Sequence, residues 1–133
     1  MERIGGMHFP VVLGLLLLAL AWPGGAPAAA QQAPLELVMF ETATCPYCKQ
    51  WHEEIGGIYP KTPEGRAAPL RRVDLDAPAP ADLRDLQRSV VYTPTFVLLR
   101  EGAEVGRIAG YPGEHFFWPL LANLLAEAGV AMN

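Results

Sequence analysis

Residues 44–49 read Thr44-Cys45-Pro46-Tyr47-Cys48-Lys49 and contain the only two cysteines of this 133-residue chain. The stretch follows an apolar, strand-like run at 35–40, and a helical pattern continues from Pro46 to about Gly56. The free backbone N–H groups and the dipole at the start of a helix stabilise negative charge, and a thiolate carries such a charge. A cysteine pair at this junction therefore predicts a thiol–disulfide exchange site.

The two cysteines have different expected roles. Cys45 falls at the predicted N-cap and Pro46 at the first helical position, where a missing N–H has no consequence. The pKa of Cys45 is therefore expected below the ~8.5 of a free thiol, which makes Cys45 the nucleophile. Cys48 lies one turn further on and is expected to resolve the mixed disulfide formed at Cys45. A purely structural disulfide is the weaker interpretation, because so short a loop removes little entropy from the unfolded chain.

Two other functions remain open at this point. His52 follows Cys48 by one helical turn, so Cys45, Cys48 and His52 could act as three soft metal ligands in a metal-binding chaperone. Closed metal sites usually take four ligands, and we therefore predict no metal site. A more acidic Cys45 would raise the reduction potential of the pair and make the protein an oxidant or isomerase instead of a reductant.

The first thirty residues have the pattern of a secretory signal peptide. Arg3 lies near the start, an apolar stretch covers 9–22, and small residues end at Ala30, where we expect cleavage. The apolar stretch is shorter than the roughly 20 residues that span a bilayer, which disfavours a retained membrane anchor. We therefore expect 1–30 to be a signal peptide and 31–133 to be a single domain in the periplasm. In that oxidising compartment a reductant needs an electron donor.

Charge argues against nucleic acid as a partner. The formal net charge is −4, and no basic run is longer than Arg71-Arg72. The acidic and basic residues are otherwise interspersed, as on an ordinary solvated surface.

Periodicity along the chain predicts the element order β-α-β-α-β-β-α. Strand patterns occupy 35–40, 71–76, 95–99 and 105–109, and helical patterns occupy 46–56 and 82–90. A final amphipathic helix has its apolar residues on one predicted stripe: Phe116, Phe117, Leu120, Leu121, Leu124 and Leu125. Pro119 is expected in the first turns of that helix or at a kink. The predicted fold is α/β, a central mixed four-stranded sheet with helices on both faces.

This layout, together with a second motif, resembles the thioredoxin superfamily. The motif is Tyr92-Thr93-Pro94-Thr95-Phe96, in which a proline opens a predicted buried strand. The resemblance implies that Pro94 is cis and lies against the Cys45-Pro46-Tyr47-Cys48 turn. It also implies that the backbone of Thr93 pairs with a partner chain, with Pro46 and Tyr47 beside it. Gly110 would lie next to Pro94, where the absence of a side chain lets the partner approach.

The turn is also similar to those of glutaredoxins and periplasmic disulfide isomerases. The rest of the chain resembles a different group of proteins. The leader, the length and the Gly110-Tyr111-Pro112-Gly113 segment resemble the small periplasmic thioredoxins of bacterial sulfur-oxidation (Sox) operons, the SoxS type. That resemblance implies a monomeric reductase without a bound cofactor. Its substrate would be a disulfide or persulfide on a partner protein, and a membrane thiol transporter would donate the electrons. Met39 stands where thioredoxins carry a buried Asp, so Glu41 or a water is expected to replace that carboxylate.

Overall fold

The computed structural model describes residues 34–131. The predicted signal peptide therefore lies outside the described residues. Within 34–131 no helix is long and apolar enough to cross a membrane.

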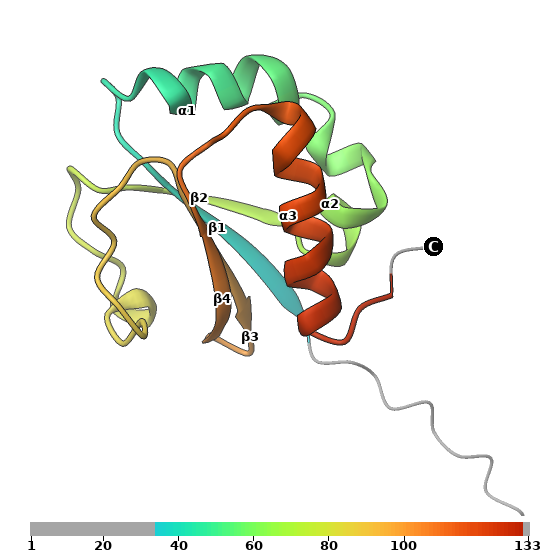
Figure 1. Cartoon of the computed structure of the whole chain (residues 1–133). Coiled ribbons are helices and arrows are strands. Elements are labelled where there is room, and N and C mark those ends of the chain that lie inside the picture. The colour runs from blue at the N-terminus through green and yellow to red at the C-terminus, as the bar shows by residue number, and fades with distance from the viewer. Residues whose placement is uncertain (1–33, 132–133) are drawn as a thin grey trace, which may run out of the picture. The chain divides into compact units, whose positions relative to one another are not determined.

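A four-stranded mixed sheet forms the centre of the fold (Figure 1). Its strands, in the spatial order β2-β1-β3-β4, are β1 (Leu35–Glu41), β2 (Leu70–Asp74), β3 (Thr95–Arg100) and β4 (Ala103–Ala109). β1 runs parallel to β2 and antiparallel to β3, and β3 and β4 form an antiparallel hairpin. The predicted mixed sheet is therefore confirmed. β1 and β3 are its central strands, and both are largely buried because the sheet is covered on both faces.

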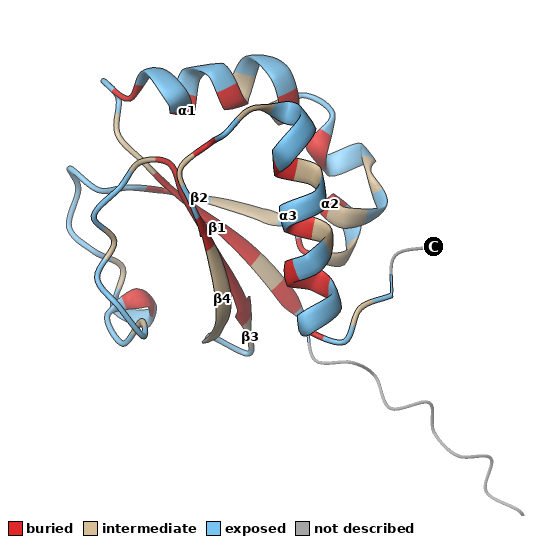
Figure 2. Ribbon diagram, in the orientation of Figure 1, coloured by how far each residue is buried: buried red, intermediate tan, exposed pale blue. Residues whose placement is uncertain are grey.

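One face of the sheet carries the long helices. α1 (Pro46–Trp51) continues as a π-helical segment, η1 (His52–Gly56), which together match the predicted helix, and α3 is the C-terminal helix (Glu114–Glu127). Figure 2 shows α3 with its buried residues on the sheet side. Trp51 and Phe117 are fully buried there, and their rings lie 5.8 Å apart. The aromatic core holds the C-terminal end of α1 against the sheet, since Trp51 also contacts Phe96 of β3.

Two short helices between α1 and β2 were not predicted from the periodicity. They are η2 (Tyr59–Lys61) and α2 (Pro63–Ala67). The Thr62 hydroxyl accepts a hydrogen bond from the Gly65 backbone N–H at 3.0 Å, and Pro63 occupies the first turn. An N-cap threonine followed by proline is a recognisable helix start, so the sequence did contain the signal.

The opposite face of the sheet differs from the prediction. In place of a helix over 82–90, the chain forms only a 3-10 turn, η3 (Ala81–Leu83), followed by irregular backbone. Leu83 is still buried against this face, and Leu86 and Val90 pack beside it, as their apolar character required. The side chain of Arg107 on β4 donates to the Arg88 carbonyl at 2.8 Å. Side-chain partners on β4 thus satisfy backbone groups that a helix would have satisfied internally, and the predicted helix is wrong.

Two residues of the apolar stripe predicted for α3 are exposed, whereas the prediction placed the whole stripe on the sheet. Phe116 and Leu120 are 64% and 42% exposed, whereas Phe117, Leu121, Leu124 and Leu125 are buried. The sheet contacts only one side of the helix, and that side is narrower than the apolar stripe. Pro119 lies inside α3, in its early turns, as expected.

Candidate functional site

The two cysteines form a disulfide at the start of α1. Cys45 is the N-cap residue, and its Sγ accepts a hydrogen bond from the Cys48 backbone N–H at 3.0 Å. Pro46 occupies the first turn, as predicted. Cys45 is 7% exposed and Cys48 2% exposed. An N–H group of the first helical turn therefore points at the sulfur of Cys45, where it can stabilise a thiolate.

The loop before β3 has the conformation that the resemblance implied. The Thr93–Pro94 peptide bond is cis. The Thr95 hydroxyl donates to the Tyr92 carbonyl at 2.7 Å, and the Gly110 backbone N–H donates to the Pro94 carbonyl at 2.7 Å. Gly110 has φ +88°, a left-handed conformation that side chains disfavour. The structure thus brings Pro94 and Gly110 together, as predicted.

A groove of about 860 Å³ runs between α1 and this loop. Tyr47 and Gln50 of α1 line one side, and Thr93, Gly110 and Tyr111 are among the residues that line the other. None of the lining residues is Asp, Glu, Lys or Arg. Within the described residues, no hydrogen bond involves the backbone N–H or carbonyl of Thr93. These two groups are therefore free to pair with another chain in the groove.

The groove is also lined by residues that the sequence did not identify as site residues: Gln50, Tyr92, Ile108, Ala109 and Leu120. Tyr92 is 67% exposed and Tyr47 is 58% exposed. Tyr92 could have been found from its place next to the Thr93-Pro94 motif. Leu120 could not, because the apolar stripe of α3 does not distinguish residues that face the sheet from residues that face the groove.

Tyr111 links the groove to η1, the continuation of α1, through a side-chain contact. Its hydroxyl donates to the Glu54 carboxylate (Oε2). Burial and this hydrogen bond raise the pKa of Tyr111, and the same bond holds the pKa of Glu54 below its usual range. The phenol therefore stays protonated and the carboxylate stays ionised across neutral pH, which keeps the contact in place.

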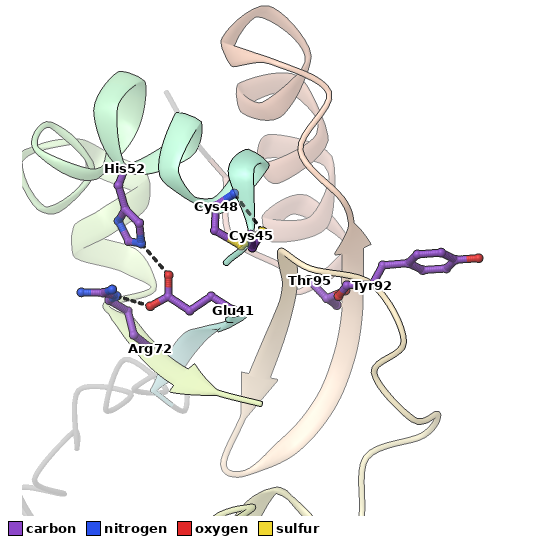
Figure 3. The surroundings of a disulfide bond; sticks show 7 residues. All are labelled: Glu41, Cys45, Cys48, His52, Arg72, Tyr92 and Thr95. Carbon is purple, nitrogen blue, oxygen red and sulfur yellow. Dashed lines mark hydrogen bonds and ion pairs between the residues drawn. A yellow bond between two sulfur atoms is a disulfide. The ribbon is translucent and has the colours of Figure 1, made fainter. Parts of the chain in front are cut away.

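A second hollow, of about 530 Å³, lies on another face of α1 and is lined by both cysteines. Glu41 at the end of β1 lies in this hollow. Its carboxylate is hydrogen-bonded to His52 Nε2 at 2.6 Å and accepts from Arg72 Nε at 2.5 Å (Figure 3). His52 is therefore engaged by Glu41. Among residues 34–131 no group of three or more His, Cys, Asp or Glu side chains is arranged to hold a metal ion.

A disulfide at a helix start facing a cis-proline loop, on a mixed four-stranded sheet, is the arrangement of a thiol–disulfide oxidoreductase. The chain belongs to the thioredoxin-like family, since the family model described as thioredoxin-like domain matches residues 26–125.

Among solved structures, the chain is similar to the periplasmic thioredoxin SoxS from Paracoccus pantotrophus in its reduced form. The two are 52% identical with a TM-score of 0.67, over 71% of this chain and 98% of that one. A thioredoxin from Thermus thermophilus is 29% identical with a TM-score of 0.54, over 71% of this chain and 76% of its own. A thioredoxin from Fasciola hepatica is 25% identical with a TM-score of 0.53, over 69% and 82%. No curated protein sequence matches the chain.

Proposed function

We propose that this protein is a periplasmic reductase that opens a disulfide or persulfide on a partner protein. The observation that carries the proposal is the position of Cys45, at the N-cap of α1 with an N–H group aimed at its sulfur. A thiolate stabilised in this way is a good nucleophile and a good leaving group. The 52% identity with a periplasmic thioredoxin supports the compartment and, with it, removal of residues 1–30 as a signal peptide.

The proposed reaction has two steps. The Cys45 thiolate attacks one sulfur of the partner disulfide, a mixed disulfide forms, and the other partner sulfur leaves as a thiolate. The Cys48 thiolate then attacks Cys45 Sγ, which closes the Cys45–Cys48 disulfide and releases the partner reduced. The partner gains two electrons and the cysteine pair loses two. A thiol donor on the membrane would return the protein to its dithiol form.

The groove between α1 and the cis-proline loop is the proposed docking site. The free backbone groups of Thr93 would pair with an extended partner segment, and Pro94 would hold that segment across the sulfur. Pro46 and Tyr47 would contact the segment from the side of α1. Gly110 leaves room for it, since an added Cβ there would meet no protein atom within 4 Å.

Trapping tests the roles of the two cysteines. In the Cys48→Ser variant the second step cannot occur, so partners are expected to accumulate as mixed disulfides with Cys45. The Cys45→Ser variant is the matched control and is expected to trap none. Non-reducing gels of periplasmic extracts, with recovery of the partners by mass spectrometry, measure the difference. Equal trapping by both variants would contradict the assigned roles.

The reduction potential of the pair decides between the reductase and its alternatives. Equilibration of the reduced protein with glutathione buffers is expected to give a value near the ~−270 mV of reducing thioredoxins. A value near ~−120 mV would instead identify a disulfide oxidant. Tight metal binding that is lost in His52→Ala would identify the metal-binding chaperone.

A further inference from the structure

The loop that joins β4 to α3 forms part of one wall of the proposed docking groove, and its backbone is weakly held. Its two glycines, Gly110 and Gly113, have φ angles of +88° and +100°. Glycine loses more backbone freedom on ordering than any other residue. Among the described residues, no backbone–backbone hydrogen bond involves Tyr111 or Pro112, which lie between these glycines. The position of this wall therefore depends on side-chain contacts.

Tyr111 supplies two such contacts. Its ring packs against Phe117 of α3, with the ring centroids 5.9 Å apart, and its hydroxyl donates to Glu54 Oε2 on η1. Figure 1 shows the loop before α3 passing beside the helix formed by α1 and η1. Within residues 34–131, no other hydrogen bond or ion pair joins α1 or η1 to residues 92–113. The hydroxyl of Tyr111 is thus the polar link between the two walls of the groove.

Glu54 also holds a side chain of the opposite wall. Its second oxygen, Oε1, accepts from Gln50 Nε2 at 2.9 Å, and Gln50 of α1 lines the groove. Glu54 itself is exposed and is not among the lining residues. One carboxylate therefore joins Gln50 on one wall to Tyr111 on the other. Polar contacts of an exposed carboxylate add little to the free energy of unfolding, so their main consequence is the geometry of the groove.

We propose that Glu54 is a positioning residue for partner docking, which fixes the spacing of the groove walls by holding Gln50 and Tyr111 together. This inference rests on the proposed function, because the groove is the docking site of that function. A preformed groove removes the cost of ordering its walls when a partner segment binds. Glu54 makes no hydrogen bond to either cysteine, so its effect is on docking and not on the attack at sulfur.

Two probes with the same leaving group separate docking from the chemistry at sulfur. One is an uncharged, extended peptide whose central cysteine carries thionitrobenzoate, and the other is N-acetylcysteinamide carrying the same group. Cys45 of the reduced protein attacks the cysteine sulfur of the probe, and thionitrobenzoate leaves as a coloured thiolate. Cys48 then closes the disulfide and releases the probe as a thiol. Since only the peptide can fill the groove, the ratio of the two rate constants, peptide over single residue, measures docking.

In Glu54→Ala this ratio is expected to fall about fivefold, because the peptide must then order both walls as it binds. Glu53→Ala is the matched control and is expected to keep the wild-type ratio. It removes the neighbouring carboxylate of η1, which is 64% exposed and lies 3.8 Å from Lys49. Glu54→Gln is expected to lie between the wild type and Glu54→Ala, because its amide oxygen can still accept from Tyr111.

Tyr111→Phe tests the same link from the other wall and serves if Glu54→Ala does not fold. It removes the hydroxyl, keeps the ring against Phe117 and is expected to lower the ratio as well. The double variant with Glu54→Ala should match Glu54→Ala alone, because both substitutions break one shared contact.

Additive losses in the double variant would overturn the inference, as would a ratio in Glu54→Ala within about twofold of the wild type. So would equal ratios in Glu54→Gln and Glu54→Ala. The failure of the proposed function has different signs. A wild type that reacts equally fast with both probes would refute the groove as the docking site, and absence of thionitrobenzoate release from both probes would refute the exchange reaction itself.

Discussion

At the scale of single residues, close packing constrains the segment between α1 and β2. Gly65 lies under the carbonyl of Tyr59, and a Cβ built on Gly65 would come 1.9 Å from that oxygen. Backbone atoms cannot move aside as a flexible side chain can. Glycine is therefore required at this position because any side chain would clash with the Tyr59 backbone. The backbone angle φ of Gly65 is not in the left-handed region, so conformation does not explain the requirement.

Gly65→Ala is predicted to lower the free energy of unfolding by about 1–3 kcal/mol, because the added methyl group displaces the Tyr59 backbone. Gly57→Ala is the matched control. Gly57 has a helical φ of −74° and no atom within 4 Å of the added Cβ, so its substitution is expected to stabilise by about 0.4–1 kcal/mol. Urea unfolding of the oxidised proteins measures both effects. Equal destabilisation by the two substitutions would contradict the steric explanation.

Tyr59 provides a prediction about pH. Its hydroxyl donates to the Ala68 carbonyl at 2.7 Å, and burial raises its pKa. Tyr59→Phe is therefore predicted to lose about 1 kcal/mol at neutral pH. The folded phenol stays protonated while the unfolded one ionises above about pH 10, so wild-type stability falls as pH rises through that range. The difference in free energy of unfolding between the wild type and Tyr59→Phe should therefore become smaller at alkaline pH. Urea unfolding midpoints of both proteins, measured at neutral and at alkaline pH, test this prediction.

At the scale of elements, a nearly buried ion pair holds the loop that replaced the predicted helix. Arg107 Nε lies 2.6 Å from Glu104 Oε1, and their side chains are only 8% and 2% exposed. The Glu104 carboxylate also accepts from the Gln87 backbone N–H at 3.0 Å. Through these contacts β4 fixes the segment that leads to Thr93, a few residues further along the chain.

Arg107→Gln is predicted to lower the free energy of unfolding by about 3 kcal/mol, because it leaves Glu104 buried without its partner. Amide hydrogen exchange over 85–92 should accelerate in this variant. Arg71→Gln, which breaks an exposed ion pair with Asp82, is the control and should cost less than about 1 kcal/mol. Similar losses of unfolding free energy in the two variants would show that burial does not increase the contribution of the Glu104–Arg107 pair to stability.

The same pair also predicts a response to acid. The hydrogen bond from Arg107 holds the pKa of Glu104 below its usual range. The pair therefore contributes stability above the ordinary pKa of a glutamate, and this contribution is lost as pH falls through the lowered value. Wild-type stability should fall more steeply with acidification than that of Arg107→Gln.

At the scale of the whole molecule, the edges of the sheet bear on the oligomeric state. β2 is an edge strand and carries Arg71 and Arg72, whose charges oppose pairing with a second sheet. The segment before β3 contacts the other edge strand, β4, through Arg107. Residues 31–133 are therefore predicted to sediment as a monomer in both the oxidised and the dithiol form. A mass that doubles with concentration would contradict this prediction.

The local sequence determined the elements whose contacts are close in the chain. Residues 45–48 lie within one helical turn, so the N-cap position of Cys45 and the place of Pro46 followed from spacing alone. The mixed sheet followed from the order of strand and helix patterns, and the cis-proline loop from resemblance to a family whose members share both motifs. Each of these features is confirmed by the structure.

Only the tertiary structure decided the features that depend on partners far along the chain. Leu83, Leu86 and Val90 have helical spacing, yet Glu104 and Arg107 hold the backbone beside them in a loop. Local spacing could not reveal this, because the competing hydrogen bonds come from another strand. The contact between Glu41 and Arg72, 31 residues apart, is likewise made by parallel pairing of β1 with β2. The sequence alone thus determined the disulfide and its helix, whereas the folded sheet assembled the charged hollow and the docking groove around them.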